Sequence, residues 1–295
     1  MKLRMLLFTL YFPFCALVLF KYQFLLRFTY LFPLLLPLFL LTVPKKMKAV
    51  RDWSIFYLIA FFYDLFRGFI PRLNSNVNPI LLAQWEGKVF GEPIPTIYLQ
   101  ERFEPYLEGF LGTILTGFYM THFILPIVVL YFLWKKNRKE YFFAVACLLL
   151  VSSLAFVTFL VFPASPPWHA SLASVVPEIK QYLLTNMNKI FNTNLLSDLY
   201  RSLNSNPYAP FPSLHAAYPM LLALISLKFF KGYFLFFLCI ALIVPFALVS
   251  FGEHYVVDII AGWGYALLSF CVVNNIYRLY QLPKRVPHSP PQSKP

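Results

Sequence analysis

The chain has 295 residues, of which 59% are hydrophobic and 13% are charged, and its formal net charge is +13. Soluble domains carry about 25% charged residues, and a soluble protein of this size could not bury so much apolar surface. The composition therefore excludes an ordinary soluble domain and indicates a membrane protein. The basic residues cluster at the ends of apolar runs, so we expect them to meet anionic lipid headgroups and not nucleic acid.

Continuous apolar runs predict membrane-spanning helices. A spanning helix needs roughly 20 mainly apolar residues, whereas the strands of a membrane barrel would alternate. In chain order the runs are 5–20, 28–43, 53–70, 110–133, 141–162, 213–228, 232–251 and 254–277. The first two are short and broken by proline, so residues 1–52 are expected to form a membrane hairpin; no small-residue cleavage site precedes Lys21, and the first run is treated as retained. We predict an all-α polytopic transmembrane bundle of about eight spans.

Basic residues set the expected orientation. They cluster in the loops 44–52 and 134–140, around 228–231 and after residue 277, which the positive-inside rule places in the cytoplasm. The long loops 71–109 and 163–212 would then be extracytoplasmic. The second loop has amphipathic pieces near 173–190 and 195–203, which we expect to lie along the interface and admit lipid sideways. Residues 53–281 form the predicted main membrane domain, and residues 282–295 a disordered cytoplasmic tail.

The first chemically informative segment is Pro212-Ser213-Leu214-His215. Proline suits the first turn of a helix, because its missing N–H has no helical partner there. Ser213, the backbone amide of Leu214 and His215 would then lie at a helix N-terminus, where free N–H groups and the helix dipole favour a bound phosphate. The alternative is a helix cap beside a surface histidine.

The second segment is His254-Tyr255-Val256-Val257-Asp258. Residues four apart share one face of a helix, so His254 and Asp258 are expected to pair. A carboxylate that holds one imidazole nitrogen fixes the tautomer and makes the other nitrogen a better nucleophile or base. The alternative is a purely structural pair. A metal site is not expected, because no third ligand stands at a useful spacing.

A third polar group, Tyr63-Asp64 with Arg67, lies near the end of the third expected span. Arg67 is a candidate phosphate ligand, because its planar guanidinium suits two oxygens. It can equally pair with Asp64 or anchor the helix end at the interface. The predicted directions of the spans place Arg67 and both histidine segments at similar depth, near the extracytoplasmic face.

These residues resemble the type 2 phosphatidic acid phosphatase (PAP2) superfamily, in particular its inositol phosphorylceramide synthase-like branch. The superfamily combines a Pro-Ser-x-His motif with a later His-x-x-x-Asp motif. The resemblance covers roughly residues 53–275 and implies a six-helix core. It also implies that His254 is the nucleophile that forms a phosphohistidine, that Asp258 orients it, that His215 protonates the leaving oxygen, and that Ser213 helps to hold the phosphate. Further segments similar to that branch are Leu99-Gln100, 119–123, 162–168 and Gly262-Trp263.

The chain departs from the phosphatase members of the superfamily in two features. Their first motif, a lysine followed by Arg-Pro, is not evident in this chain. The phosphatase members also carry an arginine six residues before the second histidine, where this chain has Leu248. The phosphate must then find a cation elsewhere, and Arg67 is the first candidate, before Arg72 and Arg102. A phosphodiester carries less charge than a phosphomonoester dianion, so the missing arginine favours headgroup transfer over phosphate hydrolysis.

The other candidate residues are expected to line the substrate pocket or to have structural roles. His122 lies inside a predicted span and could instead bond within the bundle, and Trp168 could be an interfacial belt residue. The pocket candidates are Tyr63, Asp64, His122, Trp168, His169 and Tyr255. All four cysteines lie in apolar runs and are interpreted as packing residues, with no disulfide, metal or cofactor implied.

Together these features predict a multi-pass enzyme of the cell membrane that moves a phosphate-linked headgroup between lipids, with phosphoinositol as the candidate headgroup. A lipid-phosphate or polyprenyl-diphosphate phosphatase would use the same histidines, with water as the acceptor. A proton-coupled transporter is a third alternative, but it would need polar residues through the depth of several spans. The oligomeric state is left open.

Overall fold

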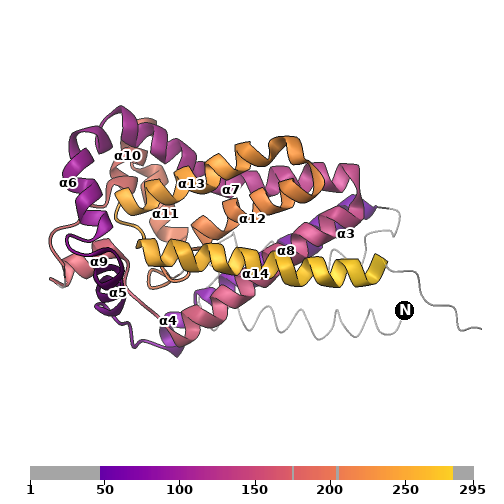
Figure 1. The fold of residues 1–295 in the computed structure, drawn as a ribbon, viewed down its shortest axis with the longest axis horizontal. Coiled ribbons are helices and arrows are strands. Elements are labelled where there is room, and N and C mark those ends of the chain that lie inside the picture. The colour runs from indigo at the N-terminus through magenta and orange to yellow at the C-terminus, as the bar shows by residue number, and fades with distance from the viewer. Residues whose placement is uncertain (1–46, 175, 204–205, 282–295) are drawn as a thin grey trace, which may run out of the picture. The chain divides into compact units, whose positions relative to one another are not determined.

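The computed structural model describes residues 47–281 except 175 and 204–205 (Figure 1). The expected spans 5–20 and 28–43 and the expected tail 282–295 lie outside the described residues. The chain divides into two compact units between Leu73 and Asn74. The domain boundary drawn from the sequence lies earlier, at 52/53, and the assignment of a separate hairpin domain remains a prediction.

The described part of the first unit consists of α3 (Lys48–Arg67) and α4 (Ile70–Leu73). Together they are long and apolar enough to cross a membrane. Arg67 lies in the last turn of α3, where a cation is favoured by the helix dipole. Its Nη2 lies 3.0 Å from Asp64 Oδ1, so the structure contains the Arg67–Asp64 pair that the sequence offered as an alternative to phosphate binding.

The regular elements among the described residues of the second unit are all helices, apart from an isolated backbone bridge between Asn78 and Ala164. Its elements are α5 (Leu81–Phe90), α6 (Pro95–Leu107), α7 (Phe110–Lys136), α8 (Arg138–Val161), α9 (Pro167–Leu172), α10 (Tyr182–Phe191), α11 (Leu195–Leu203), α12 (Leu214–Phe229), η2 (Lys231–Tyr233), α13 (Phe234–Ser250) and α14 (Val256–Gln281). The all-α expectation is confirmed.

The long helices of this unit are apolar on all sides, as expected for segments that face both a protein core and lipid. Four candidate spans meet the length and hydropathy needed to cross a bilayer: Phe110–Lys136, Arg138–Val161, Lys231–Ser250 and Val256–Tyr280. Leu214–Phe229 is apolar but shorter. It is the central helix, because it packs against α7, α8, α13 and α14. Large apolar side chains on the outer helices stay exposed, for example Phe132 and Leu235, and a bilayer would cover them.

Two lysines at the ends of long helices of the second unit bond to neighbouring helix ends. Lys136 at the end of α7 donates to the Phe229 carbonyl at the end of α12 (2.9 Å), and Lys228 donates to Asn274 Oδ1 near the end of α14 (2.8 Å). Both lysines therefore lie at the helix ends that the charge rule assigns to the cytoplasm.

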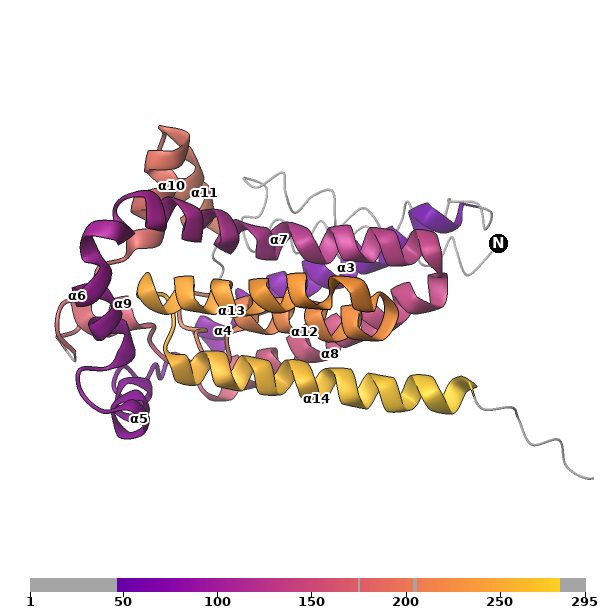
Figure 2. The same cartoon turned by 45° about the horizontal axis from the view of Figure 1, so that its top comes forward.

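The shorter helices α5, α6, α9, α10 and α11 gather at the opposite end of this unit (Figures 1 and 2). They are built from the two long connections that the sequence predicted, 71–109 and 163–212. The amphipathic piece expected near 195–203 is α11, but the piece expected near 173–190 is helical only from Tyr182 to Phe191. Pro177 accounts for the difference, because a proline cannot supply the N–H that a helix interior requires.

Candidate active site

The first site segment is the start of α12, where Ser213 is the residue that caps the helix. Its Oγ accepts from the Ala216 amide (3.3 Å), and its carbonyl accepts from the Ala217 amide (3.0 Å). Pro212 therefore precedes the cap and is not in the first helical turn, as the sequence had suggested. The Ser213 amide in turn donates to the Asp258 carbonyl (3.0 Å), so a backbone bond joins the two motif segments directly.

The second site segment is a tight turn between α13 and α14. The amides of Glu253 and His254 both donate to the Leu248 carbonyl, at 3.0 and 3.3 Å. Gly252 has φ of +74°, and a Cβ there would lie 2.7 Å from Ile179, so the turn requires glycine. The Leu248 side chain, at the position of the missing arginine, is fully buried.

His254 lies outside the helix, two residues before α14 begins at Val256. The prediction that it shares a helical face with Asp258 is therefore wrong, although the two side chains do meet. Asp258 in the first helical turn points back toward the turn, and its Oδ2 accepts from the Tyr255 amide (2.9 Å) and lies 3.2 Å from His254 Nδ1. An acidic residue in this position commonly bonds the backbone just before the helix.

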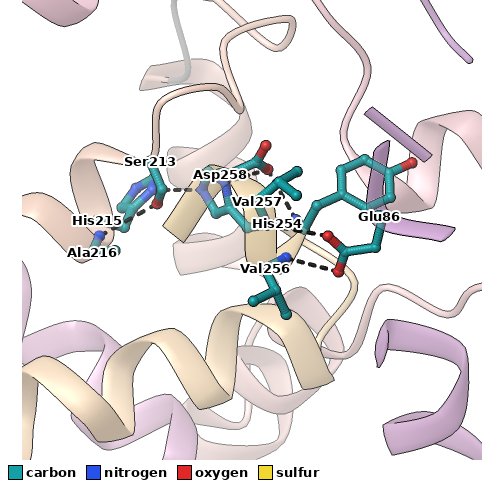
Figure 3. A network of polar contacts seen from close by, with 9 residues as sticks. Glu86, Ser213, His215, Ala216, His254, Val256, Val257 and Asp258 are labelled. Carbon is teal, nitrogen blue, oxygen red and sulfur yellow. Dashed lines mark hydrogen bonds and ion pairs between the residues drawn. The ribbon is translucent and has the colours of Figure 1, made fainter. Parts of the chain in front are cut away.

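A chain of polar contacts links the two motif segments (Figure 3). His215 Nδ1 lies 3.1 Å from His254 Nε2, and His254 Nδ1 lies 3.2 Å from Asp258 Oδ2. Because an ionised carboxylate only accepts hydrogen bonds, the Asp258 contact places the proton of a neutral His254 on Nδ1 and leaves the lone pair on Nε2. His254 is 5% exposed and Asp258 is 0% exposed, so this arrangement is shielded from water.

One carboxylate at the site was not among the candidates from the sequence. Glu86 on α5 is fully buried, and its two oxygens accept from the amides of Val256 (2.9 Å) and Val257 (3.1 Å) at the start of α14. Burial raises the pKa of Glu86 to about 7, although the two amide bonds act in the opposite direction. The sequence showed Glu86 only as one of several acidic residues in an expected loop, and no local pattern connects it with residues so distant in the chain.

Glu253, which precedes His254, is a second acidic group that the sequence analysis did not single out. Gln181 Nε2 donates to its Oε1 (3.0 Å). Loss of hydration raises the pKa of Glu253 to about 7, and the Gln181 bond and the nearby His254 partly offset this effect. Gln100 supports the same region, because its side chain bonds the Lys180 amide and carbonyl and the Ser250 carbonyl at 2.9–3.0 Å.

The other candidates of the second unit lie around this chain. The His122 ring packs edge-on against the His215 ring, with centroids 4.6 Å apart, and Tyr119 Oη lies 3.5 Å from His215 Nε2. The Trp168 amide donates to the Gly252 carbonyl (3.1 Å). His169 Nδ1 lies 3.1 Å from Ser165 Oγ, and the Tyr255 side chain is fully buried.

Three predicted site residues, Tyr63, Asp64 and Arg67, belong to the first compact unit, and their roles at the site remain predictions. Among the residues that the structure describes, no three His, Cys, Asp or Glu side chains are grouped so that they could hold a metal ion.

Comparisons with known proteins show the family to which the chain belongs. The sequence profile of the PAP2 superfamily matches residues 104–272, a stretch that contains both histidine motifs. A protein of Bacteroides thetaiotaomicron named phosphoinositol dihydroceramide synthase is 30% identical over 257 residues, which is 80% of each chain. The inositol phosphorylceramide synthase catalytic subunit aur1 of Schizosaccharomyces pombe is 29% identical over 128 residues, which is 41% of this chain and 29% of that protein. No solved structure matches. The chain is therefore a membrane protein that belongs to the PAP2 superfamily.

Proposed function

We propose that this protein transfers a phosphoinositol headgroup from a donor phospholipid to the hydroxyl of a ceramide-type acceptor through a phosphohistidine at His254. The observation that carries the proposal is the His215–His254–Asp258 chain, in which one imidazole nitrogen is fixed by a carboxylate and the other faces a second histidine. The choice of headgroup and acceptor rests on the relative from B. thetaiotaomicron, whose similarity extends over 80% of both chains.

In the first step, the lone pair of His254 Nε2 attacks the phosphorus of the donor phosphodiester. The bond from phosphorus to the oxygen of the diacylglycerol breaks, and a proton from His215 passes to that oxygen. A phosphoryl group on Nε2 would place its oxygens next to His215, because Nδ1 of that residue lies 3.1 Å from Nε2 in the unliganded protein. Proton transfer of this kind contributes typically about 10²–10⁴-fold to the rate.

In the second step, the acceptor hydroxyl attacks the same phosphorus and the N–P bond breaks. The hydroxyl proton returns to His215, so that the enzyme regains its starting protonation state. Asp258 holds the Nδ1 proton of His254 in both steps and stabilises the imidazolium character that develops as the N–P bond forms and breaks. With a phosphomonoester or diphosphate donor and water as the acceptor, the same residues would release free phosphate and act as a phosphatase.

We further propose that phosphate oxygens bind at the start of α12 and that the site faces the extracytoplasmic side of the cell membrane. Ser213 caps this helix by accepting from the amides of Ala216 and Ala217, and a helix N-terminus favours a bound phosphate through its N–H groups and its dipole. Arg67 stays the proposed cation for the phosphate. The orientation rests on the lysines at the other end of the bundle.

The test uses purified wild-type protein and His254→Ala in detergent. Both are given phosphatidylinositol with dihydroceramide, and separately phosphatidic acid and a polyprenyl diphosphate. New inositol phospholipid from wild type alone supports the proposed transferase. Free phosphate from wild type alone would replace the proposal with a phosphatase, and equal activity in both proteins would remove His254 as nucleophile. The transporter alternative is tested with the wild-type protein reconstituted into vesicles. Proton flux across these vesicles, without any lipid turnover, would favour that alternative.

A further inference from the structure

Helix α5 contacts both histidine-bearing segments, although it lies outside the stretch 104–272 that matches the PAP2 profile. Two adjacent residues make the contacts. Glu86 bonds the first turn of α14, and Trp85 packs on Phe211, two residues before Ser213. A single short helix therefore touches the segment that carries His254 and the segment that leads to His215.

The contact of Glu86 is a double cap. The first N–H groups of a helix have no partner within the helix, and they favour an anion. Glu86 satisfies two of them, Val256 and Val257, with one oxygen each, while Asp258 from the same turn satisfies the Tyr255 amide (Figure 3). Because Glu86 is fully buried, these bonds do not compete with water.

Glu86 also occupies the helix end beside the nucleophile. Because the amides of Val256 and Val257 already donate to Glu86, these two groups at the start of α14 are not available as donors to a phosphate.

Trp85 makes the second connection. Its ring stacks on Phe162 at the end of α8 (5.6 Å between centroids, 7° between planes) and meets Phe211 edge-on (5.9 Å, 74°). Phe162 and Phe211 also pack on each other at 5.7 Å. Aromatic groups of this kind contribute about 0.5–1.5 kcal/mol per pair beyond the area that they bury.

The base of α5 is fixed as well. Asn78 Oδ1 accepts from the amides of Ile80 and Leu81 at the start of the helix, at 3.0 and 2.9 Å. The Asn78 backbone pairs with the segment after α8, donating to the Pro163 carbonyl and accepting from the Ser165 amide. The start of α5 is therefore held by bonds that involve neither of the two histidine-bearing segments.

From these contacts we propose that α5 is a clamp that sets the distance between His215 and His254, with Glu86 as a positioning residue for the nucleophile. The catalytic unit then extends N-terminally to Asn78, beyond the matched family region. This inference rests on the proposed phosphotransferase function. Its test therefore includes a second readout that does not depend on activity, so that failure of the clamp is distinguishable from failure of the proposed function.

The central variant is Glu86→Gln, which keeps the size of the side chain. An amide can accept from one of the two N–H groups but turns its own NH₂ toward the other. We expect kcat for transfer from phosphatidylinositol to dihydroceramide to fall by about 10–100-fold while KM stays near its wild-type value, because a misplaced catalytic group affects chemistry and not substrate binding. The kcat of Glu86→Ala should be lower still, and the kcat of Glu86→Asp should lie between those of Glu86→Gln and wild type. The matched control is the exposed Glu92→Gln, which removes the same charge just beyond α5 and should leave kcat unchanged.

The second readout is the rate at which diethyl pyrocarbonate modifies each histidine, measured by peptide mass spectrometry. We expect Glu86→Gln and Glu86→Ala to increase modification of His254 while His169, at the same end of the bundle, reacts as in wild type. Unchanged kcat and unchanged His254 reactivity would overturn the clamp. A higher KM at unchanged kcat would make Glu86 a substrate ligand instead, and equally increased modification of both histidines would make it a general stabilising residue. If wild type transfers no headgroup, the proposed function fails, but the His254 reactivity still decides the role of Glu86.

Discussion

Substitution of Gly262 by alanine is expected to separate the two histidine segments. Gly262 lies one turn after Asp258 on α14, and a Cβ there would lie 2.3 Å from the Ser213 carbonyl oxygen and 3.2 Å from its carbon. Both are backbone atoms, which cannot rotate away as a side-chain end can. The space is close enough that only glycine fits without movement.

The size of the effect follows from these distances. Ordinary van der Waals contact begins at 3.4 Å, so the Ser213 backbone and α14 must separate by about 1 Å. That movement stretches the 3.0 Å bond from the Ser213 amide to the Asp258 carbonyl and carries His215, two residues later, away from His254. Overpacking typically costs about 1–3 kcal/mol of stability. A misplacement of 1 Å can lower the rate about 10²-fold.

The assay compares Gly262→Ala with Gly264→Ala in transfer rate and in thermal unfolding midpoint, both in the same detergent. Gly264 lies on the same helix, and a Cβ there meets nothing within 4 Å. We expect the control to keep its activity and its midpoint, because alanine is the better helix former. Wild-type transfer rate and midpoint in Gly262→Ala would refute the reasoning that this close backbone contact sets the site geometry.

Three further predictions concern the carboxylates and the amide around the site. Asp258→Asn should lower transfer by about 10²–10⁴-fold with little change in KM, because an amide cannot fix the His254 tautomer in the same way; steady-state kinetics test this, and a rate equal to wild type would exclude the orienting role. Gln100→Leu leaves backbone groups unpaired and should cost about 1–3 kcal/mol, seen as a lower unfolding midpoint, whereas the exposed Gln84→Leu should not change it. The pKa of both Glu86 and Glu253 is raised to about 7, so the folded protein holds their protons more tightly than the unfolded chain. The stability that these two groups contribute is then complete below pH 4.5 and is lost as the pH rises through 7. Replacing both residues with glutamine should therefore make the thermal unfolding midpoint less dependent on pH between 4.5 and 7. The same pH dependence in the double variant and in wild type would contradict the raised pKa.

Much of the architecture followed from the sequence because a bilayer imposes simple rules on it. A helix must be apolar over the membrane thickness, so the spans at 110–133, 141–162 and 232–251 were found to within a few residues. Lysine-rich ends predicted which helix termini lie together, since the charge rule acts on whole loops and not on individual contacts. The Ser213–His215 and His254–Asp258 segments were recognisable because each is a short local pattern.

The finer geometry of the site could not be obtained in this way. The sequence placed Pro212 inside α12 and His254 on a helical face, and both assignments were wrong by one or two residues. Helix ends depend on which partners satisfy the terminal amides, and those partners come from elsewhere in the chain. At α14 the partner is Glu86, which is 170 residues from Val256 in sequence.

The sequence by itself therefore determined which segments are apolar and long enough to cross a membrane and which short motifs are candidates for the chemistry, because both depend on local composition and spacing. The tertiary structure decided which groups meet: the 3.1 Å contact of the two histidines, the close approach of Gly262 to Ser213, and the carboxylate that occupies the start of α14. These are long-range contacts, and they depend on how the helices pack. The pattern of residues along the chain does not specify that packing.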